Sequence, residues 1–245
     1  MRIAFISDIH GNLAALEAVF QDIERNRIET IVCLGDIIGY GPDPAECVRQ
    51  VSSRCLVSLM GNHEAMLVYA GLDGLDGMPD HVTQPLRLAY EQLSPEQMAW
   101  LGQMPLVAAL DPVTAVHGRL DDPERFEYLF TEKDAEKNFE IQKNPVCVQG
   151  HSHVPVLWEK SDRGTFCYSQ ALEPVQLSSR SKYVVNVGSV GQPRDGHPEA
   201  CYLIYDIAER GIHHRRIAYD IAATQRRIRE VGLPEGNARR IADGL

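Results

Sequence analysis

The chain has 245 residues, of which 44% are hydrophobic and 24% charged, and this composition excludes a disordered chain, collagen-like repeats and a coiled coil. Its net charge of -10 argues against a nonspecific nucleic-acid binder, and the absence of a run of about 18 apolar residues argues against a transmembrane helix. Polar residues interrupt the first apolar stretch at Ser7 and Asp8. We therefore expect no secretory signal, reduced cysteines and a cytoplasmic protein.

Strands and helices alternate through the first sixty residues. Asn12 is expected to cap a helix in which apolar side chains recur at helical spacing from Leu13 to Ile23. The alternation predicts parallel strand pairing and an α/β class. The predicted strands cover residues 2–6, 30–34 and 55–60, and a second helix covers residues 44–51.

Residues 64–104 differ in character from the segments around them. A glycine-rich loop precedes two predicted helices at residues 81–93 and 94–104. Ser94 followed three residues later by Gln97 is typical of a capping box at the start of a helix. The insertion is either a pair of plain connecting helices or a small helical cap beside an active site.

The second half of the chain is rich in strand-like segments. One predicted helix, at about 132–142, interrupts them, and a basic helix at about 220–231 precedes a short turn at Arg239 and Arg240. Since no internal repeat or linker is visible, we expect a single domain over residues 1–245 with two β-sheets. The predicted strands cover residues 105–110, 113–117, 146–149, 154–159, 165–169, 183–187, 200–206 and 212–218.

Five short segments carry side chains typical of metal ligands, and each follows a predicted strand, where open α/β sheets bind ligands. Side chains two positions apart on an extended chain point the same way, so Asp8 can join His10, and His151 can join His153. Imidazole, carboxylate and amide oxygen suit Mn, Fe, Zn or Ni better than Mg or Ca. The set is large enough for two ions about 3.5–4 Å apart that share a carboxylate. The candidate ligands are Asp8, His10, Asp36, Asn62, His117, His151 and His153.

The motifs D-x-H, GD-x-x-G, GNHE, HG and GH-x-H follow one another over residues 8–153. This order resembles the calcineurin-like binuclear metallophosphoesterase superfamily, and within it the small bacterial and archaeal phosphoesterases. The resemblance implies an α/β fold of the α+β type, in which a two-sheet β-sandwich is flanked by helices (αββα). It also implies that a hydroxide bridging two divalent transition-metal ions attacks a phosphomonoester or a phosphodiester.

The resemblance also implies roles for individual residues. His63 would be a catalytic group beside the substrate, donating to the leaving group or to a phosphate oxygen. Asp36 would bridge the two metals and so take part in catalysis. The first metal would be bound by Asp8, His10, Asp36 and His153, and the second by Asp36, Asn62, His117 and His151.

One departure from the family pattern bears on the substrate. Phosphoprotein phosphatases and symmetrical diadenosine tetraphosphatases have a phosphate-binding arginine where this chain has Tyr40, and a tyrosine hydroxyl cannot bind phosphate bidentately. A dinucleoside polyphosphate hydrolase and a phosphoprotein phosphatase therefore stay as alternatives. A nuclease, or a non-catalytic scaffold on the same fold, is less favoured.

A later segment, residues 186–196, offers a replacement for the missing arginine. Arg194 and the main-chain amides of Gly188 and Ser189 can contact substrate phosphate, or the segment is a plain loop with a solvated Arg194–Asp195 pair. Tyr40 either contacts substrate or packs its ring. The expected partner is a small phosphate ester, with no membrane and no nucleic acid, and the oligomeric state is open.

Overall fold

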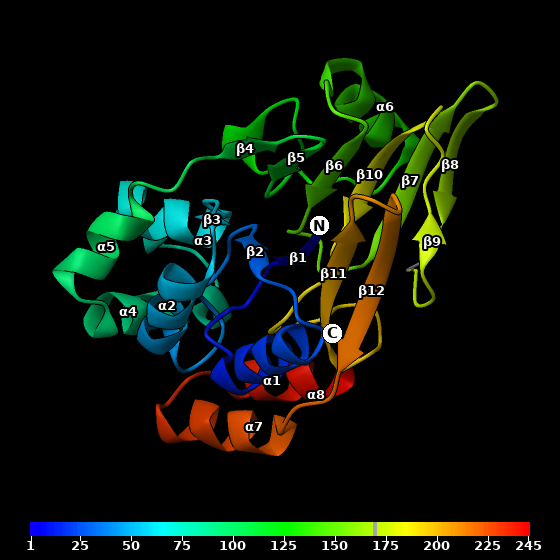
Figure 1. Ribbon diagram of the computed structural model, residues 1–245. Coiled ribbons are helices and arrows are strands. Elements are labelled where there is room, and N and C mark those ends of the chain that lie inside the picture. The colour runs from blue at the N-terminus through cyan, green and yellow to red at the C-terminus, as the bar shows by residue number, and fades with distance from the viewer. Residues whose placement is uncertain (169–170) are drawn as a thin grey trace.

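The computed structural model describes residues 1–168 and 171–245, and it contains two mixed β-sheets of six strands each with helices on their outer faces (Figure 1). The two-sheet sandwich flanked by helices is confirmed. The first sheet, in spatial order, contains β3 (Val57–Ser58), β2 (Thr30–Cys33), β1 (Arg2–Ile6), β11 (Ala200–Asp206), β12 (Gly211–Ile217) and β9 (Val175–Gln176). The second contains β4 (Val107–Leu110), β5 (Val113–Val116), β6 (Val146–Gln149), β10 (Lys182–Asn186), β7 (Val156–Ser161) and β8 (Gly164–Tyr168).

The expected parallel pairing is present in the first half of the chain. β1, β2 and β3 are parallel neighbours, and β11 then extends the sheet by antiparallel pairing with β1. In the second sheet β5, β6 and β10 are parallel. The carboxyl ends of parallel strands lie at one edge of a sheet, which places the loops after them close together.

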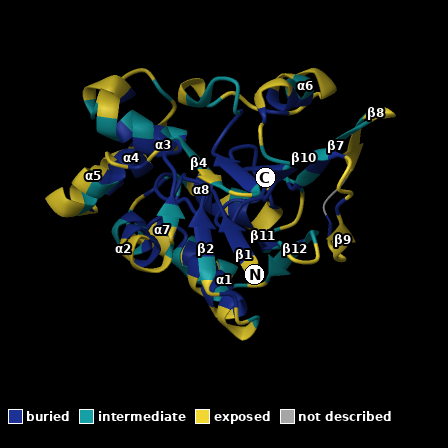
Figure 2. Ribbon diagram, turned by 45° about the horizontal axis from the view of Figure 1, so that its top comes forward, coloured by how far each residue is buried: buried dark blue, intermediate teal, exposed yellow. Residues whose placement is uncertain are grey.

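The core follows the period-2 alternation of the strands. In β1, Ile3 and Phe5 face the apolar layer between the two sheets, whereas Ala4 and Ile6 face the helices. Figure 2 shows buried strands at the centre and exposed residues on the outer helices. The helices with core-facing residues are α1 (Leu13–Arg25), α2 (Pro44–Arg54), α4 (Asp80–Gln92), α5 (Pro95–Leu101), α6 (Glu132–Ile141), α7 (Ile221–Glu230) and α8 (Glu235–Asp243).

The insertion of residues 64–104 is largely helical. The short helix α3 (Asn62–Ala65) runs into a π-helical turn, and α4 and α5 then pack against α2. The capping box is confirmed, because Ser94 Oγ accepts from the amide of Gln97 and Gln97 Oε1 accepts from the amide of Ser94. The amino-terminal end of α4 reaches the site, where His81 stacks 6.3 Å from the ring of Tyr40.

Three sequence expectations differ from the structure. The turn predicted at Arg239 and Arg240 is wrong: these residues lie in α8, whose Ala238 and Ile241 pack against Ile228. This packing stabilises a helix too short to be stable alone. The strand expected at 55–60 is reduced to β3, and the short strand β9 was not expected.

The remaining expectations concern the end of one strand, the cysteines and membrane-spanning helices. Ser169, the last residue of a predicted strand, lies outside the described residues. All six cysteines are free thiols. Across residues 1–168 and 171–245, every helix is too short or too polar to cross a bilayer.

Candidate metal centre

The loops that follow β1, β2, β3, β5 and β6 bring the predicted ligands to one place, at the carboxyl-terminal ends of strands from both sheets. Five of these residues adopt left-handed backbone conformations with φ between 49° and 66°, which is uncommon for residues other than glycine. Main-chain hydrogen bonds hold the strained loops together, including one of 3.0 Å from the Asp8 amide to the Gly35 carbonyl. Such strain concentrates at functional sites. The five residues are Asp8, His10, Asp36, His151 and His153.

Three of the histidines place Nδ1 against a main-chain carbonyl oxygen. A carbonyl only accepts hydrogen bonds, so each Nδ1 carries a proton and each Nε2 is left to face the centre of the site. This orientation is usual for histidines that bind metals. The contacts are His10 to Ile38 at 3.0 Å, His117 to Leu34 at 2.9 Å and His153 to Gln192 at 2.5 Å.

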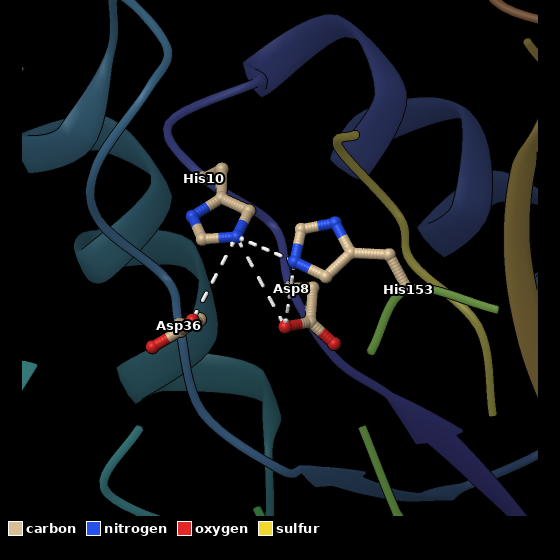
Figure 3. A group of neighbouring side chains, drawn as sticks. All are labelled: Asp8, His10, Asp36 and His153. Atoms are coloured by element: carbon tan, nitrogen blue, oxygen red, sulfur yellow. Dashed lines mark hydrogen bonds and ion pairs between the residues drawn. The ribbon is translucent and has the colours of Figure 1, made fainter. Parts of the chain in front are cut away.

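A first group of ligand atoms comes from Asp8, His10, Asp36 and His153 (Figure 3). The Nε2 atoms of His10 and His153 are 3.2 Å apart, and His153 Nε2 is 3.3 Å from Asp8 Oδ1. With both rings neutral, two lone pairs face each other at this distance. Asp8 Oδ1 also has no hydrogen-bond donor within the described part of the chain. A cation among these atoms would satisfy all of them, so the donor set fits a metal ion.

A second group comes from Asp36, His117 and His151, and its ligand atoms lie within 4.8 Å of one another. His117 Nε2 is 3.4 Å from Asp36 Oδ2 and 3.3 Å from Asn62 Oδ1. Asp36 belongs to both groups. The structure therefore brings all seven predicted ligands together, with Asp36 between the two groups.

The buried carboxylates of the site need compensating positive charge. Burial by itself would raise the pKa of Asp8 and of Asp36, but the adjoining histidines hold both values well below the usual range. Burial likewise opposes a charge on His117, yet the carboxylate of Asp36 raises the pKa of His117 to about 9. Two ionised carboxylates are thus buried with imidazoles, and either protons or metal ions can supply the compensating charge.

Glu64 is a residue of the site to which the sequence assigned no role. Its side chain is fully buried and accepts main-chain hydrogen bonds of 2.8–3.1 Å from the loop of Asp36 and from Gly61. It therefore ties the loop after β2 to the turn that carries Asn62. The sequence contained a signal for this role, because a glutamate at the third position of a helix commonly caps the helix start.

His63 lies beside the predicted ligands without pointing its ring into either ligand group. Its ring centroid is 4.8 Å from those of His10 and Tyr40, and its amide donates to Asp36 Oδ1 at 3.0 Å. Nδ1 of His63 has no partner among the described residues. Burial lowers the pKa of His63, so its imidazole is neutral at neutral pH.

Arg194 lies over the ring of Tyr40, which also contacts the ring of His10. Its guanidinium carbon is 5.5 Å from the Tyr40 centroid, and that centroid is 4.6 Å from the His10 ring. Arg194 donates to Gln192 Oε1 at 2.9 Å. The alternative of a solvated Arg194–Asp195 pair is not what forms, because Asp195 is paired with Arg216 instead.

Gly188 and Ser189 lie beneath the site rather than at its mouth. The Gly188 amide, which we expected to face phosphate, donates to Asn186 Oδ1 at 3.0 Å. The Ser189 hydroxyl donates to the main-chain oxygen of Asp8 at 2.8 Å, and Ser189 is fully buried. These contacts favour a supporting role under Asp8, because the Gly188 amide has no second proton to offer a substrate.

Aromatic side chains border the other side of the centre. The ring of Tyr128 stacks 4.1 Å from His151, and Phe130 stacks 5.1 Å from Tyr128. Both aromatic residues are exposed. Sequence reasoning missed them because no local pattern links the loop after β5 to the loop after β6.

Comparisons with known proteins agree with this geometry. The family model described as calcineurin-like phosphoesterase matches residues 1–185. A crystal structure of a metallophosphoesterase from Sphaerobacter thermophilus is 36% identical, superposes with a TM-score of 0.89, and the match covers 100% of this chain and 99% of that one. An uncharacterised protein of Methanocaldococcus jannaschii is 35% identical over 95% of this chain and 94% of its own length. Phosphodiesterase YfcE of Escherichia coli is 27% identical over 84% of this chain and 88% of its own.

Proposed function

Because the chain belongs to the calcineurin-like phosphoesterase family, we propose that it hydrolyses a phosphomonoester or phosphodiester at a centre of two divalent transition-metal ions. The observation that carries the proposal is the pair of buried ligand groups that share Asp36. Ions bound there would polarise the phosphoryl group and lower the pKa of a water molecule between them. Imidazole-rich donors favour Mn, Fe, Zn or Ni for both positions.

The ligand roles in this proposal follow the two groups. Asp8, His10 and His153 hold the first ion. The hydrogen bonds from Nδ1 of His10 and His153 to main-chain oxygens keep the two imidazole rings from turning. Asp36 would bridge the two ions, since its Oδ2 lies 3.7 Å from His10 Nε2 of the first group and 3.4 Å from His117 Nε2 of the second. The second ion is held by Asn62, His117 and His151, together with Asp36.

Two further side chains act on the substrate. His63, held next to Asp36 by its own main-chain amide, donates an N–H to a phosphate oxygen as charge develops there. Arg194, which lies over the ring of Tyr40, binds another oxygen of the phosphate. It thereby replaces the arginine that the phosphoprotein phosphatases have at the position of Tyr40. Gly188 and Ser189 support the loop of Asp8 in this scheme.

Phosphodiesters are the first substrates to try, because one relative carries the name phosphodiesterase. The arrangement of Arg194 and Tyr40 also leaves dinucleoside polyphosphates and phosphoproteins as second candidates. The chain's net charge of -10 disfavours a nuclease.

A substrate panel on protein reconstituted with Mn²⁺, and separately with Zn²⁺, tests the proposal. We expect turnover of bis-p-nitrophenyl phosphate or p-nitrophenyl phosphate, and little turnover of single-stranded DNA or phosphopeptides. Asp36→Asn should abolish turnover and lower the metal content, whereas Asp76→Asn, at an 81% exposed side chain, should change neither. Two full metal sites in Asp36→Asn would refute the bridging role, and a wild type that hydrolyses none of these esters would refute the function.

A further inference from the structure

The helix α8 lies directly against the candidate site, although it follows the part of the chain that the family model matches. At its start, the Asn237 side chain donates to the main-chain oxygen of Tyr40 at 2.9 Å. At its end, the amide of Gly196 donates to the oxygen of Gly244 at 2.9 Å. Arg240 lies between these two anchors, on a helix that is fixed to the loop of Tyr40 and to the loop of Gly196.

Arg240 and Arg194 are cations on two segments that the hydrogen bond from Gly196 to Gly244 holds together. Both are half-buried, and neither pairs with an aspartate or glutamate in residues 1–168 and 171–245. Arg240 Nε donates to the main-chain oxygen of Leu245 at 3.0 Å, and Arg194 donates to the side chain of Gln192. Burial and the charge of Arg194 lower the pKa of Arg240. Two partly desolvated like charges are unfavourable together unless an anion binds them.

Arg194 is one aromatic ring away from the ligands of the first metal group, and Arg240 lies on the helix that Asn237 anchors to the main chain of Tyr40. Arg194 lies over the ring of Tyr40, which also contacts the rings of His10 and His63, with centroids 4.6 and 4.8 Å away. Metal ions would already neutralise the phosphate that is cleaved. Arg240 is therefore in excess of what a single phosphate needs, and its position suits an anionic group attached to that phosphate.

We propose that Arg240 binds a second phosphate group, next to the phosphate that Arg194 contacts, so that the protein selects substrates with two linked phosphates, such as a nucleoside diphosphate or its ester. Guanidinium groups bind phosphate through two parallel N–H donors, and the Nη groups of Arg240 are not occupied by other described residues. The proposal rests on the phosphoesterase function given above. It assigns to α8 a role in substrate selection.

Calorimetric titration of the Mn²⁺-loaded protein with AMP and with ADP tests the subsite, because the two nucleotides differ by one phosphate. Arg240→Met keeps an unbranched apolar stem and removes the charge and the guanidinium donors. The matched control is Arg239→Met on the same helix, which removes the same charge from a side chain that is 76% exposed and pairs with Glu235. Chelation of Mn²⁺ by either nucleotide occurs in solution, so it is the same for every variant and cancels in the comparison.

We expect Arg240→Met to weaken ADP about 10-fold to 100-fold, the range for a lost charged hydrogen bond, and AMP less than threefold. Arg240→Lys should recover part of the ADP affinity, and thermal unfolding should show that all variants fold. Equal losses for AMP and ADP, no loss for either, a loss as large in Arg239→Met, or a wild type that binds ADP no better than AMP would each overturn the proposal. Turnover of bis-p-nitrophenyl phosphate by the same samples tests the phosphoesterase function separately.

Discussion

Glu64 shows how one carboxylate can organise a metal centre without belonging to it. Its two oxygens accept from four main-chain amides, those of Asp36, Ile37, Ile38 and Gly61. In Glu64→Gln an NH₂ group replaces one oxygen and faces amides that can only donate. We expect a loss of roughly 2–3 kcal/mol in the free energy of unfolding. We also expect weaker metal binding, because the change disturbs the loop of Asp36 and the turn that carries Asn62.

Urea unfolding and metal analysis measure both effects of this change. Glu24→Gln is the matched control, since Glu24 has a 66% exposed side chain on the surface of α1. Its unfolding and metal content should match those of the wild type. Wild-type metal content in Glu64→Gln would show that the two loops hold their geometry without the carboxylate.

His63 can be assigned a chemical role by varying the leaving group. Burial lowers its pKa, so the ring is neutral at neutral pH and donates a hydrogen bond rather than a proton. His63→Ala should keep both metal sites and lower kcat/KM by a factor of roughly 10²–10³, similar for nitrophenyl and alkyl esters. His63→Gln, which keeps an N–H donor, should recover part of the rate. A loss that grows with the pKa of the leaving group would instead identify His63 as the general acid.

The grouping of the seven candidate ligands could be predicted from the sequence because each position depends on a local rule. Residue types suitable for metals stand directly after strands, and parallel strands end at the same edge. The functions of Glu64 and Gly188 could not be predicted, because they depend on which main-chain amides a folded loop leaves unpaired. The same holds for Tyr128, whose stacking on His151 joins two loops that are distant in the sequence.

At the scale of elements, a half-buried ion pair joins α1 to the first sheet. Asp22 of α1 accepts from the hydroxyl of Tyr202 in β11 at 2.7 Å and from Arg215 in β12 at 3.0 and 3.1 Å. Burial would raise the pKa of Asp22, but these hydrogen bonds hold it below the usual value. The carboxylate therefore contributes stability above about pH 4, which is lost as the pH falls through the lowered pKa.

Asp22→Asn tests this contribution. Because Arg215 is a third exposed, we expect the variant to lose only about 1–2 kcal/mol in the free energy of unfolding at pH 7. The difference from the wild type should shrink steadily on acidification below about pH 4. Urea titrations at pH 7, 5 and 3 measure it. A difference that stays constant with pH would mean that Asp22 acts through packing alone.

The accuracy of element prediction depended on how far packing overrides local signals. α1 and α5 could be predicted with their caps because Asn12 and Ser94 are residues that favour the N-cap position. α8 could not, since its nine residues contain Gly236 and follow Pro234, and its stability comes from Ile228 and the other apolar residues of α7. The functional consequence was also hidden, because only the folded position of α8 brings Arg240 to the site.

At the scale of the whole molecule, the centre joins the two sheets, because Asp8 and Asp36 follow strands of the first sheet while His117 and His151 follow strands of the second. Ions held by all four residues would therefore also cross-link the two layers. An ion that binds only the folded chain stabilises it by RT ln(1 + [ion]/Kd), about 2.7 kcal/mol at a hundredfold excess over Kd.

Removal of the metals should accordingly lower the melting temperature of the whole domain. For a protein of this size about 1 kcal/mol corresponds to roughly 2–4 °C, so each site filled at a hundredfold excess should raise Tm by roughly 5–10 °C. Calorimetry in chelator and in graded Mn²⁺ measures the shift. Asp36→Asn, which lacks the shared ligand, should respond weakly to Mn²⁺, and Asp76→Asn should respond like the wild type. A melting temperature independent of Mn²⁺ in the wild type would show that the ligand groups do not bind it, and the cross-link between the sheets would then have to come from packing of the apolar layer alone.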